Sequence, residues 1–369
     1  MISIDENTSK RITSLRFLLM LFVMIKHNAI VKGLFVRELP FYEPGIITFI
    51  KEFFANGLGE LAVPVFFFFS GYLLAASGDS YVTTLKKRFK SIFVPYSIWT
   101  VLYFMWWLML NHFHFTYGNP VADWREWGFI TYLERFTGYI GGIKFAWFPF
   151  VGSFWFLRDL MMLIIFSPVL FLLIRRFPFL IILASSLCYL FSMTLPFVQS
   201  VSFFYFSFGI FFASQKIDFF ALTDKINWFD IIIPFTTAFT IYTLQPDYNT
   251  DGGIHHSIFF FLFIFSGILG LLKFSNIIIN NECAFSLAKK LAPYTFFTYA
   301  IHSPILIEII KKLTYRITSV QTYEGAFRSL AQFVLACILD IGISLGTGIL
   351  LSKICPPIFV VLSGGRRKQ

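Results

Sequence analysis

Two polar residues in the first apolar run have types and a spacing that could do chemistry together. The stretch SLRFLLMLFVMIKHN (14–28) carries Arg16 near its start and His27 near its end, eleven positions later. Eleven steps of about 100° complete three helical turns plus about 20°, and at about 1.5 Å each they cover about 16 Å. A helix would therefore present Arg16 and His27 on one face, at different depths.

The chemistry of the two side chains differs. A neutral imidazole takes a proton from a hydroxyl and later returns one, because histidine titrates near neutral pH. A guanidinium binds phosphate through two parallel donors. Together they suit an elongated molecule that donates an acyl group, with a phosphorylated head near Arg16 at the cytoplasmic side and a reactive tip at His27. An acyl-CoA has this shape. Two simpler interpretations stay open: Arg16 as an anchor at the membrane boundary, and His27 as a hydrogen-bonding partner of another helix.

The composition of the chain indicates the solvent around this helix. Hydrophobic residues make up 57% of the 369 residues, 52 of them are Phe, and only 14% are charged. One soluble domain of this length cannot bury so much apolar surface, so we expect an all-α integral membrane protein. The net charge is +10, and most of the basic residues lie between the apolar runs. Basic residues at such positions set the orientation of a protein in the membrane, so they do not indicate binding of nucleic acid. The four cysteines stand singly, and the adjacent His255 and His256 have no obvious third ligand, so we expect no metal site.

About ten apolar runs approach the length of about 20 residues that a membrane-spanning helix needs. They are expected at 12–33, 58–77, 92–111, 153–174, 178–197, 199–215, 229–245, 255–273, 292–311 and 330–353. Ten spans place both termini on one side, and the basic segments at 10–11, 86–90, 175–176 and 366–368 predict that this side is cytoplasmic. The segment 112–152 is the longest on the outer side and is rich in aromatic residues, which suit either an interfacial belt or a platform for sugar rings. We expect one transmembrane domain over 1–369.

Further motifs follow the Arg16–His27 spacing in a fixed order. They are VPVFFFFSGYLLA (63–75), KKRFKSIFVPYSIW (86–99), FWFLRDLM (154–161) and FFTYAIHSPIL (296–306). With an Arg, ten residues and a His in the first span, this series resembles the acyltransferase 3 family of membrane proteins, which O-acylate cell-surface sugars and polysaccharides. The resemblance covers nearly the whole chain. Some members also carry an extramembrane esterase-like domain, and we expect none here.

The resemblance implies functional roles for ten residues. His27 would act as general base on a hydroxyl or pass the acyl group onward, and Arg16 would help to bind the anionic donor. The donor-binding and substrate-binding candidates are Arg88, Lys90, Ser70, Gly71, Tyr72, Trp155, Arg158 and His302. Members often carry a second Arg where this chain has Ser91, so the basic loop is a weaker candidate for phosphate binding than Arg16.

Structural alternatives accompany several of these candidates. Ser70 and Gly71 also suit tight helix packing. Arg158 and Asp159 are sequence neighbours, which do not face each other on a helix, so each is expected to need its own partner. His302 could hydrogen-bond a carbonyl left free near a proline two positions later. We expect the mid-span Asp340 to pair with a Lys or Arg of another span.

The expected function is transfer of an acyl group, taken to be acetyl, from cytoplasmic acyl-CoA to a hydroxyl of a cell-surface or lipid-linked saccharide. Acyl-CoA would be a co-substrate, with no bound cofactor. The expected partners are the lipid bilayer, the saccharide acceptor and other enzymes of envelope-polysaccharide synthesis, and the resemblance implies a bacterial cytoplasmic membrane. The alternative is a transporter or flippase of a lipid-linked saccharide, in which the same charges line a path. A transporter would move its substrate without consuming acyl-CoA.

Overall fold

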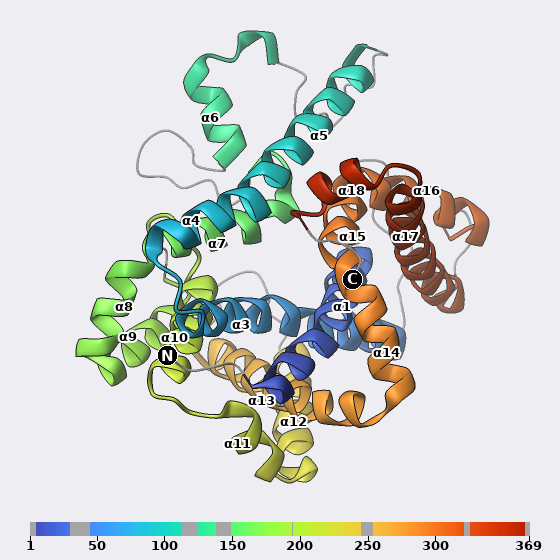
Figure 1. Cartoon of the computed structure of the whole chain (residues 1–369). Helices are drawn as coiled ribbons and strands as arrows, with labels where there is room; N and C mark the ends of the chain where they lie inside the picture. The colour runs from blue at the N-terminus through green and yellow to red at the C-terminus, as the bar shows by residue number, and fades with distance from the viewer. Residues whose placement is uncertain are drawn as a thin grey trace. The chain divides into compact units, whose positions relative to one another are not determined.

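The chain folds into helices. The computed structural model describes residues 5–29, 45–112, 124–137, 149–193, 195–244, 254–320 and 325–365, and these contain helices but no strand (Figure 1). The predicted all-α class is therefore confirmed over this part of the chain. Much of the aromatic segment 112–152, the basic residues 366–368 and the side chains of His255 and His256 lie outside the described residues.

The chain divides into two compact units, each assembled from three separate segments. The first unit comprises Met1–Val23, Glu52–Thr84 and Met162–Ala292; the second comprises Met24–Lys51, Leu85–Met161 and Pro293–Gln369. Helix α1 (Glu6–Ala29) contributes residues to both units. The expectation of a single transmembrane domain stays a prediction.

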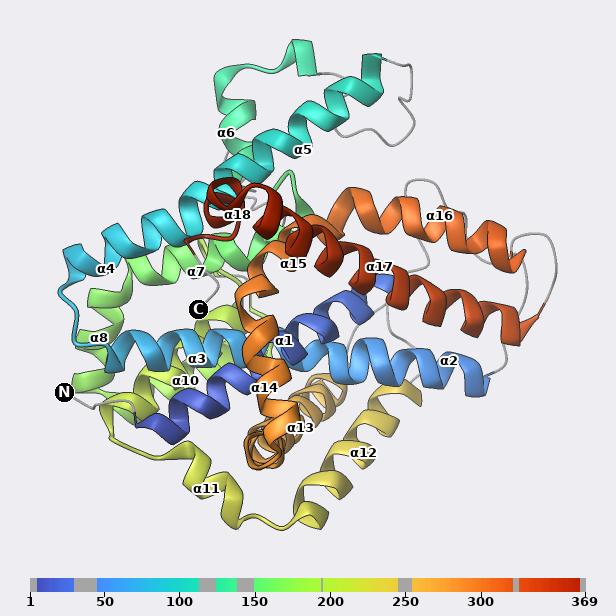
Figure 2. The ribbon, with the colours of Figure 1, turned by 45° about the vertical axis from the view of Figure 1, so that its right-hand side comes forward.

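Helix α3 packs lengthwise against helix α10 at the centre of the first unit (Figures 1 and 2). Helices α8 and α9 also contact α10, and α12 lies along α13. The helices of this unit are α3 (Ala62–Ala76), α8 (Ser167–Arg176), α9 (Pro178–Leu190), α10 (Ser200–Ser214), α11 (Phe219–Lys225), α12 (Trp228–Leu244), α13 (Ile254–Asn280) and α14 (Glu282–Leu291). Two short turns, Phe53–Leu58 and Gly59–Leu61, lead into α3.

Two glycines allow α3 and α10 to approach closely. A Cβ atom on Gly71 of α3 would lie 2.1 Å from the carbonyl oxygen of Phe206, and one on Gly209 of α10 would lie 2.1 Å from that of Phe68. No side chain fits at either position, so the two backbones are in direct contact. Such contacts between small residues are a common way for helices to associate in membranes. The structure therefore gives Gly71 a packing role.

Helices α16 and α17 lie side by side in the second unit, and α18 packs on both α17 and α5 (Figure 2). The helices that lie wholly or partly in this unit are α2 (Gly45–Glu52), α4 (Tyr81–Arg88), α5 (Val94–His112), α6 (Phe129–Thr137), α7 (Trp155–Ile165), α15 (Thr295–Ile301), α16 (Ile307–Thr318), α17 (Ala326–Ile354) and α18 (Pro356–Leu362). A π-helical segment, η7 (His302–Leu306), separates α15 from α16.

Within the ranges that the structure describes, five helical segments are long and apolar enough to cross a membrane. They are Glu6–Ala29, Gly45–Ala76, Tyr81–His112, Ile258–Asn280 and Phe327–Ile354. A sixth span results if Gly152–Ile165 and Ser167–Arg176, which are bent by 64°, are taken together. The chain is thus a helical protein with several potential spans. The expected total of ten is not confirmed within these ranges, because α9, α10 and α12 are short and the expected span at 292–311 is broken.

Candidate active site

Two histidines far apart in the sequence meet in the second unit. The ring centroids of His27 on α1 and His302 at the end of α15 are 5.4 Å apart, with their planes inclined by 53°. His302 is fully buried, whereas His27 is half-buried. Both residues were candidates in the sequence, but their proximity was not predicted.

A break in the helix places His302. Pro304 has no amide hydrogen, and Ser303 is in an extended conformation (φ −136°, ψ 142°), so the helical hydrogen bonds cannot continue. The hydroxyl of Tyr103 on α5 instead donates to the carbonyl oxygens of Ala300 (2.7 Å) and Ile301 (3.2 Å). The break is therefore satisfied by a side chain, as the interior of a membrane protein requires.

The hydrogen bonding of His302 assigns its tautomer. Its Nδ1 lies 2.6 Å from the carbonyl oxygen of Tyr299. A carbonyl oxygen only accepts, so Nδ1 carries the hydrogen and the neutral ring keeps its lone pair on Nε2. That Nε2 atom is buried and has no hydrogen-bond partner among the described residues. The bond to a nearby carbonyl that the sequence suggested is thus present, and it leaves a base on the other side of the ring.

Tyr299 is itself held in place. Its hydroxyl donates to the carbonyl oxygen of Ser153, in the turn just before α7, and its ring packs beside Phe154. The carbonyl that orients His302 therefore belongs to a residue fixed at both its backbone and its side chain. Such outer contacts keep a reactive ring in one orientation.

The residue after His27 binds a buried acid. The Asn28 amide donates to the carbonyl oxygen of Met24 (3.0 Å) and to Oδ2 of Asp340 on α17 (2.8 Å). Ser344 makes a longer contact with the same carboxylate, at 3.4 Å. Lys311 of α16 is buried and interacts electrostatically with Asp340. The predicted partner of Asp340 was a cation, but its hydrogen bond goes to an amide, with the cation in its surroundings.

Arg158 and Asp159 contact each other, contrary to the prediction from the sequence. The Nε and one terminal nitrogen of Arg158 donate to Oδ1 of Asp159, at 3.0 and 2.7 Å, and both residues are buried. Adjacent Cβ atoms do diverge on a helix. The arginine side chain is nevertheless long enough to fold back, and burial favours neutralising its charge.

The other candidate residues lie in two places. Arg16 is exposed on α1, and Ser70, Gly71 and Tyr72 belong to α3 of the first unit. The second unit holds three more: Arg88 is half-buried at the end of α4, Lys90 is exposed, and Trp155 is half-buried at the start of α7. Of the ten candidates, His27 and His302 are thus the two whose rings the structure brings together.

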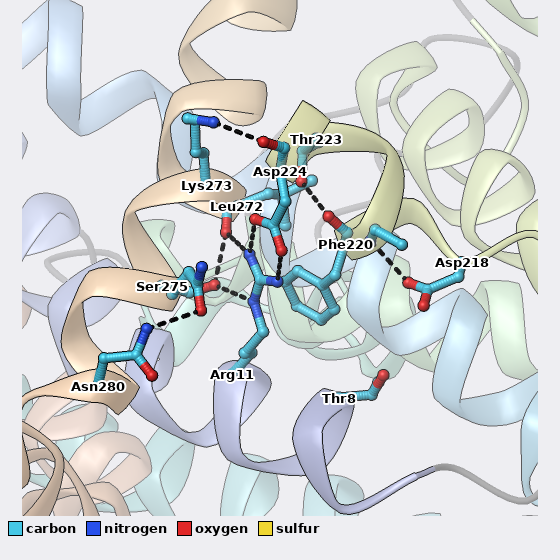
Figure 3. A network of polar contacts seen from close by, with 12 residues as sticks. Thr8, Arg11, Asp218, Phe220, Thr223, Asp224, Leu272, Lys273, Ser275 and Asn280 are labelled. Atoms are coloured by element: carbon cyan, nitrogen blue, oxygen red, sulfur yellow. Dashed lines mark hydrogen bonds and ion pairs between the residues drawn. The ribbon is translucent and has the colours of Figure 1, made fainter. Parts of the chain in front are cut away.

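Arg11, which the sequence predicts only as one of the cytoplasmic charges, forms a buried network in the first unit (Figure 3). The guanidinium of Arg11 binds both carboxylate oxygens of Asp224 on α11, at 2.6 and 2.9 Å. It also donates to Ser275 (2.8 Å) and to the Leu272 carbonyl oxygen (2.6 Å) of α13, and it lies 4.1 Å from the centre of the Phe220 ring. These contacts join three helices and occupy the guanidinium. We therefore assign Arg11 a structural role.

The described part of the aromatic segment lines a cavity of about 280 Å³ in the second unit. Its walls are Thr100, Val101, Phe104, Trp127, Tyr132, Leu133, Arg135, Phe136 and Phe150. The Arg135 guanidinium lies 5.3 Å from the centre of the Trp127 ring. This largely apolar lining favours a ring or an alkyl chain as occupant.

Known proteins resemble almost the whole chain. A family model described as an acyltransferase domain matches residues 9–349. The succinoglycan biosynthesis protein ExoH of Rhizobium meliloti (strain 1021) is 25% identical over 384 residues, which covers 98% of this chain and 94% of that protein. No solved structure matches. Because the matched region includes both histidines and nearly all the described helices, the chain belongs to the acyltransferase 3 family.

Proposed function

We propose that the protein is a multi-pass membrane O-acyltransferase that moves an acyl group from acyl-CoA to a hydroxyl of a cell-surface or lipid-linked polysaccharide. The observation that carries this proposal is the placement of His27 beside the buried imidazole of His302, within a region that matches an acyltransferase domain. The relative's role in succinoglycan biosynthesis supports a polysaccharide or its precursor as the acceptor.

In the proposed reaction, His27 takes the proton from the acceptor hydroxyl. The hydroxyl oxygen then bonds to the thioester carbonyl carbon, the carbon–sulfur bond breaks, and coenzyme A leaves as a thiol after receiving the proton. General-base catalysis of this kind typically contributes about 10²–10⁴-fold to the rate. The half-buried position of His27 is compatible with access by a substrate.

The donor would lie along α1. Arg16 is on the same continuous helix as His27, about 16 Å away by helix geometry, and would bind the phosphates of acyl-CoA. Arg88 and Lys90 would add positive charge. We further propose acetyl as the acyl group, ten membrane crossings with both termini in the cytoplasm, and the cytoplasmic membrane of a bacterium as the location.

Transfer of labelled acetyl tests this proposal. Membranes containing the protein are incubated with labelled acetyl-CoA, and label in cell-envelope material is measured for wild type, His27→Ala and Arg16→Ala. His112→Ala serves as the matched control, because it removes a histidine at the end of α5. We expect loss of transfer of about 10²–10⁴-fold for His27→Ala, a weaker affinity for acetyl-CoA with Arg16→Ala, and little change for the control.

Two results would contradict the proposal. Transfer that persists without His27 would show that His27 is not the base. Absence of any acetyl-CoA consumption by the wild-type protein, with movement of an unaltered saccharide across the membrane, would favour the transporter.

A further inference from the structure

The ring of His302 has a basic nitrogen, Nε2, that takes no part in the proposed reaction. Its Nδ1–H is bonded to the Tyr299 carbonyl, so its lone pair is on Nε2. Nε2 is buried and without a hydrogen-bond partner in the described structure. A buried acceptor without a partner is unfavourable, and groups of this kind in native proteins often have a functional explanation.

The position of the ring suggests that explanation. The His302 ring lies beside the ring of His27, and the helix break around Ser303 holds it there. Catalytic bases are commonly oriented by a third group that accepts a hydrogen bond from their second nitrogen. The lone pair on Nε2 has the chemistry of such an acceptor. The Asp340 carboxylate accepts a hydrogen bond from the Asn28 amide.

We propose that His302 accepts a proton from His27 during the reaction, an inference that rests on the proposed acyl transfer. Its Nε2 accepts a hydrogen bond from the distal nitrogen of His27 when substrates are bound. This contact fixes which nitrogen of His27 faces the acceptor hydroxyl. His302 is thus a positioning residue that also stores the proton.

Two proton transfers accompany the attack of the acceptor hydroxyl. The hydroxyl proton moves to the proximal nitrogen of His27 while the proton on its distal nitrogen moves to Nε2 of His302. His27 stays neutral, and His302 becomes an imidazolium whose Nδ1–H bond to the Tyr299 carbonyl is then charge-assisted. After the carbon–sulfur bond breaks, the two protons shift back, and the departing thiolate receives one. The products are the ester and the free thiol of coenzyme A.

The surroundings of the two rings contain charges of both signs. Lys26 is next to His27 on α1, Lys311 of α16 acts electrostatically on His27, and the neighbouring Asn28 is bound to Asp340 of α17. Tyr103 of α5 donates to the carbonyl oxygens of Ala300 and Ile301, directly before His302. Those carbonyl groups are thus already satisfied, and Nε2 is left as an acceptor.

The alternative is that His302 serves only to bind the Tyr299 carbonyl. The substitution His302→Asn separates the two roles, because an asparagine amide can donate from nearly the same position as Nδ1 but has no basic atom at the position of Nε2. We would measure the rate at saturating acetyl-CoA and the half-saturating acetyl-CoA concentration in membranes that contain the native acceptor. The His27→Ala and His27→Ala/His302→Asn variants complete a double-mutant cycle.

We expect His302→Asn to reduce the saturated rate at least tenfold and by up to about 10⁴-fold, with an unchanged half-saturating concentration. The double variant should be no slower than His27→Ala alone, since residues that act as a unit are not additive. If His302→Asn does not accumulate, recovery of His302→Gly by added imidazole takes its place as the test, and absence of recovery would overturn the proposal.

Other outcomes show whether the role of His302 alone is wrong or the proposed acyl transfer is wrong as well. A wild-type rate in His302→Asn, or losses that multiply in the double variant, would overturn the role of His302 and leave the acyltransferase intact. A wild-type protein that consumes no acetyl-CoA would overturn both proposals.

Discussion

Asn28 connects the proposed base to a buried carboxylate. Its amide bonds to Asp340 on α17, and its neighbour His27 contacts His302. The two contacts are made by successive residues of α1, so they fix both the position and the rotation of the end of this helix. The orientation of His27 therefore depends on residues that need not touch a substrate.

Removing the acid should destabilise the second unit. Asp340→Ala leaves the Asn28 amide without this acceptor and removes one of two negative charges that act on buried Lys311, the other being that of Glu308. An unsatisfied buried group costs roughly 1–3 kcal/mol. We expect a lower thermal unfolding midpoint in detergent for Asp340→Ala, and a smaller decrease for Asp340→Asn, which keeps an acceptor oxygen.

Ser344→Ala is the matched control, since it removes only the 3.4 Å contact. Equal midpoints for Asp340→Ala and Ser344→Ala would show that the Asn28–Asp340 bond contributes little.

The sequence predicted individual reactive residues better than their partners. Arg16 and His27 were predictable because a helical period relates residues eleven apart. The meeting of His27 with His302, 275 positions later, depends on tertiary packing and leaves no periodic signal. The Arg158–Asp159 contact was missed for a different reason: the rule for neighbours describes Cβ directions and not the reach of a long side chain.

At the scale of the helices, the contact between α3 and α10 depends on two glycines. Gly71 and Gly209 each face a backbone carbonyl of the opposite helix, and the Phe68 ring packs beside the rings of Phe212 and Phe219. The backbones provide the close approach, while the rings fill the space around it. The helix pair is thus joined by backbone contact at the two glycines and by ring contacts around them.

Gly71→Ala should disrupt this packing. The added Cβ would lie 2.1 Å from the Phe206 carbonyl oxygen, so the helices must separate. Gly346→Ala in α17 is the control, because a Cβ there meets nothing within 4 Å and alanine favours a helix by about 1 kcal/mol. We expect a lower unfolding midpoint or lower accumulation for Gly71→Ala, and an equal or higher midpoint for Gly346→Ala. Identical behaviour of the two variants would refute this account of the packing.

Most helices were predictable from long apolar runs, but their interruptions were not. The runs at 92–111 and 330–353 correspond to α5 and α17 within a few residues. The run at 292–311 was expected to form one span, yet it breaks at Ser303. A proline indicates that a helix can be interrupted there; whether it is depends on side chains such as Tyr103 that satisfy the freed carbonyls.

At the scale of the whole molecule, each unit is built from segments distant in sequence. The boundary at Val23 and Met24 falls inside an uninterrupted helix, and no glycine-rich or proline-rich linker marks it. Such a division follows from contacts among helices, which composition does not encode. Apolar runs and basic loops predicted a helical membrane protein, but not how its helices are grouped.

A native cysteine can test the proposed membrane orientation. Cys283 is exposed at the start of α14, in a segment with Lys289 and Lys290 that should face the cytoplasm. A membrane-impermeant maleimide should therefore label it in inside-out vesicles and not in intact spheroplasts. Cys283→Ser controls for the three remaining cysteines, which are less exposed. Labelling of Cys283 in intact spheroplasts would reverse the predicted orientation.

The glycine contact between α3 and α10 also has a consequence for motion. Packed backbones have no side-chain layer that could be rearranged, and sliding one helix along the other would drive Cβ atoms into carbonyl groups. Shear between these two helices is therefore costly, and we expect them to move as one rigid body during turnover. Any displacement of Ser70 or Tyr72 on α3 would then carry α10 with it, so substrate entry must rely on more loosely packed elements.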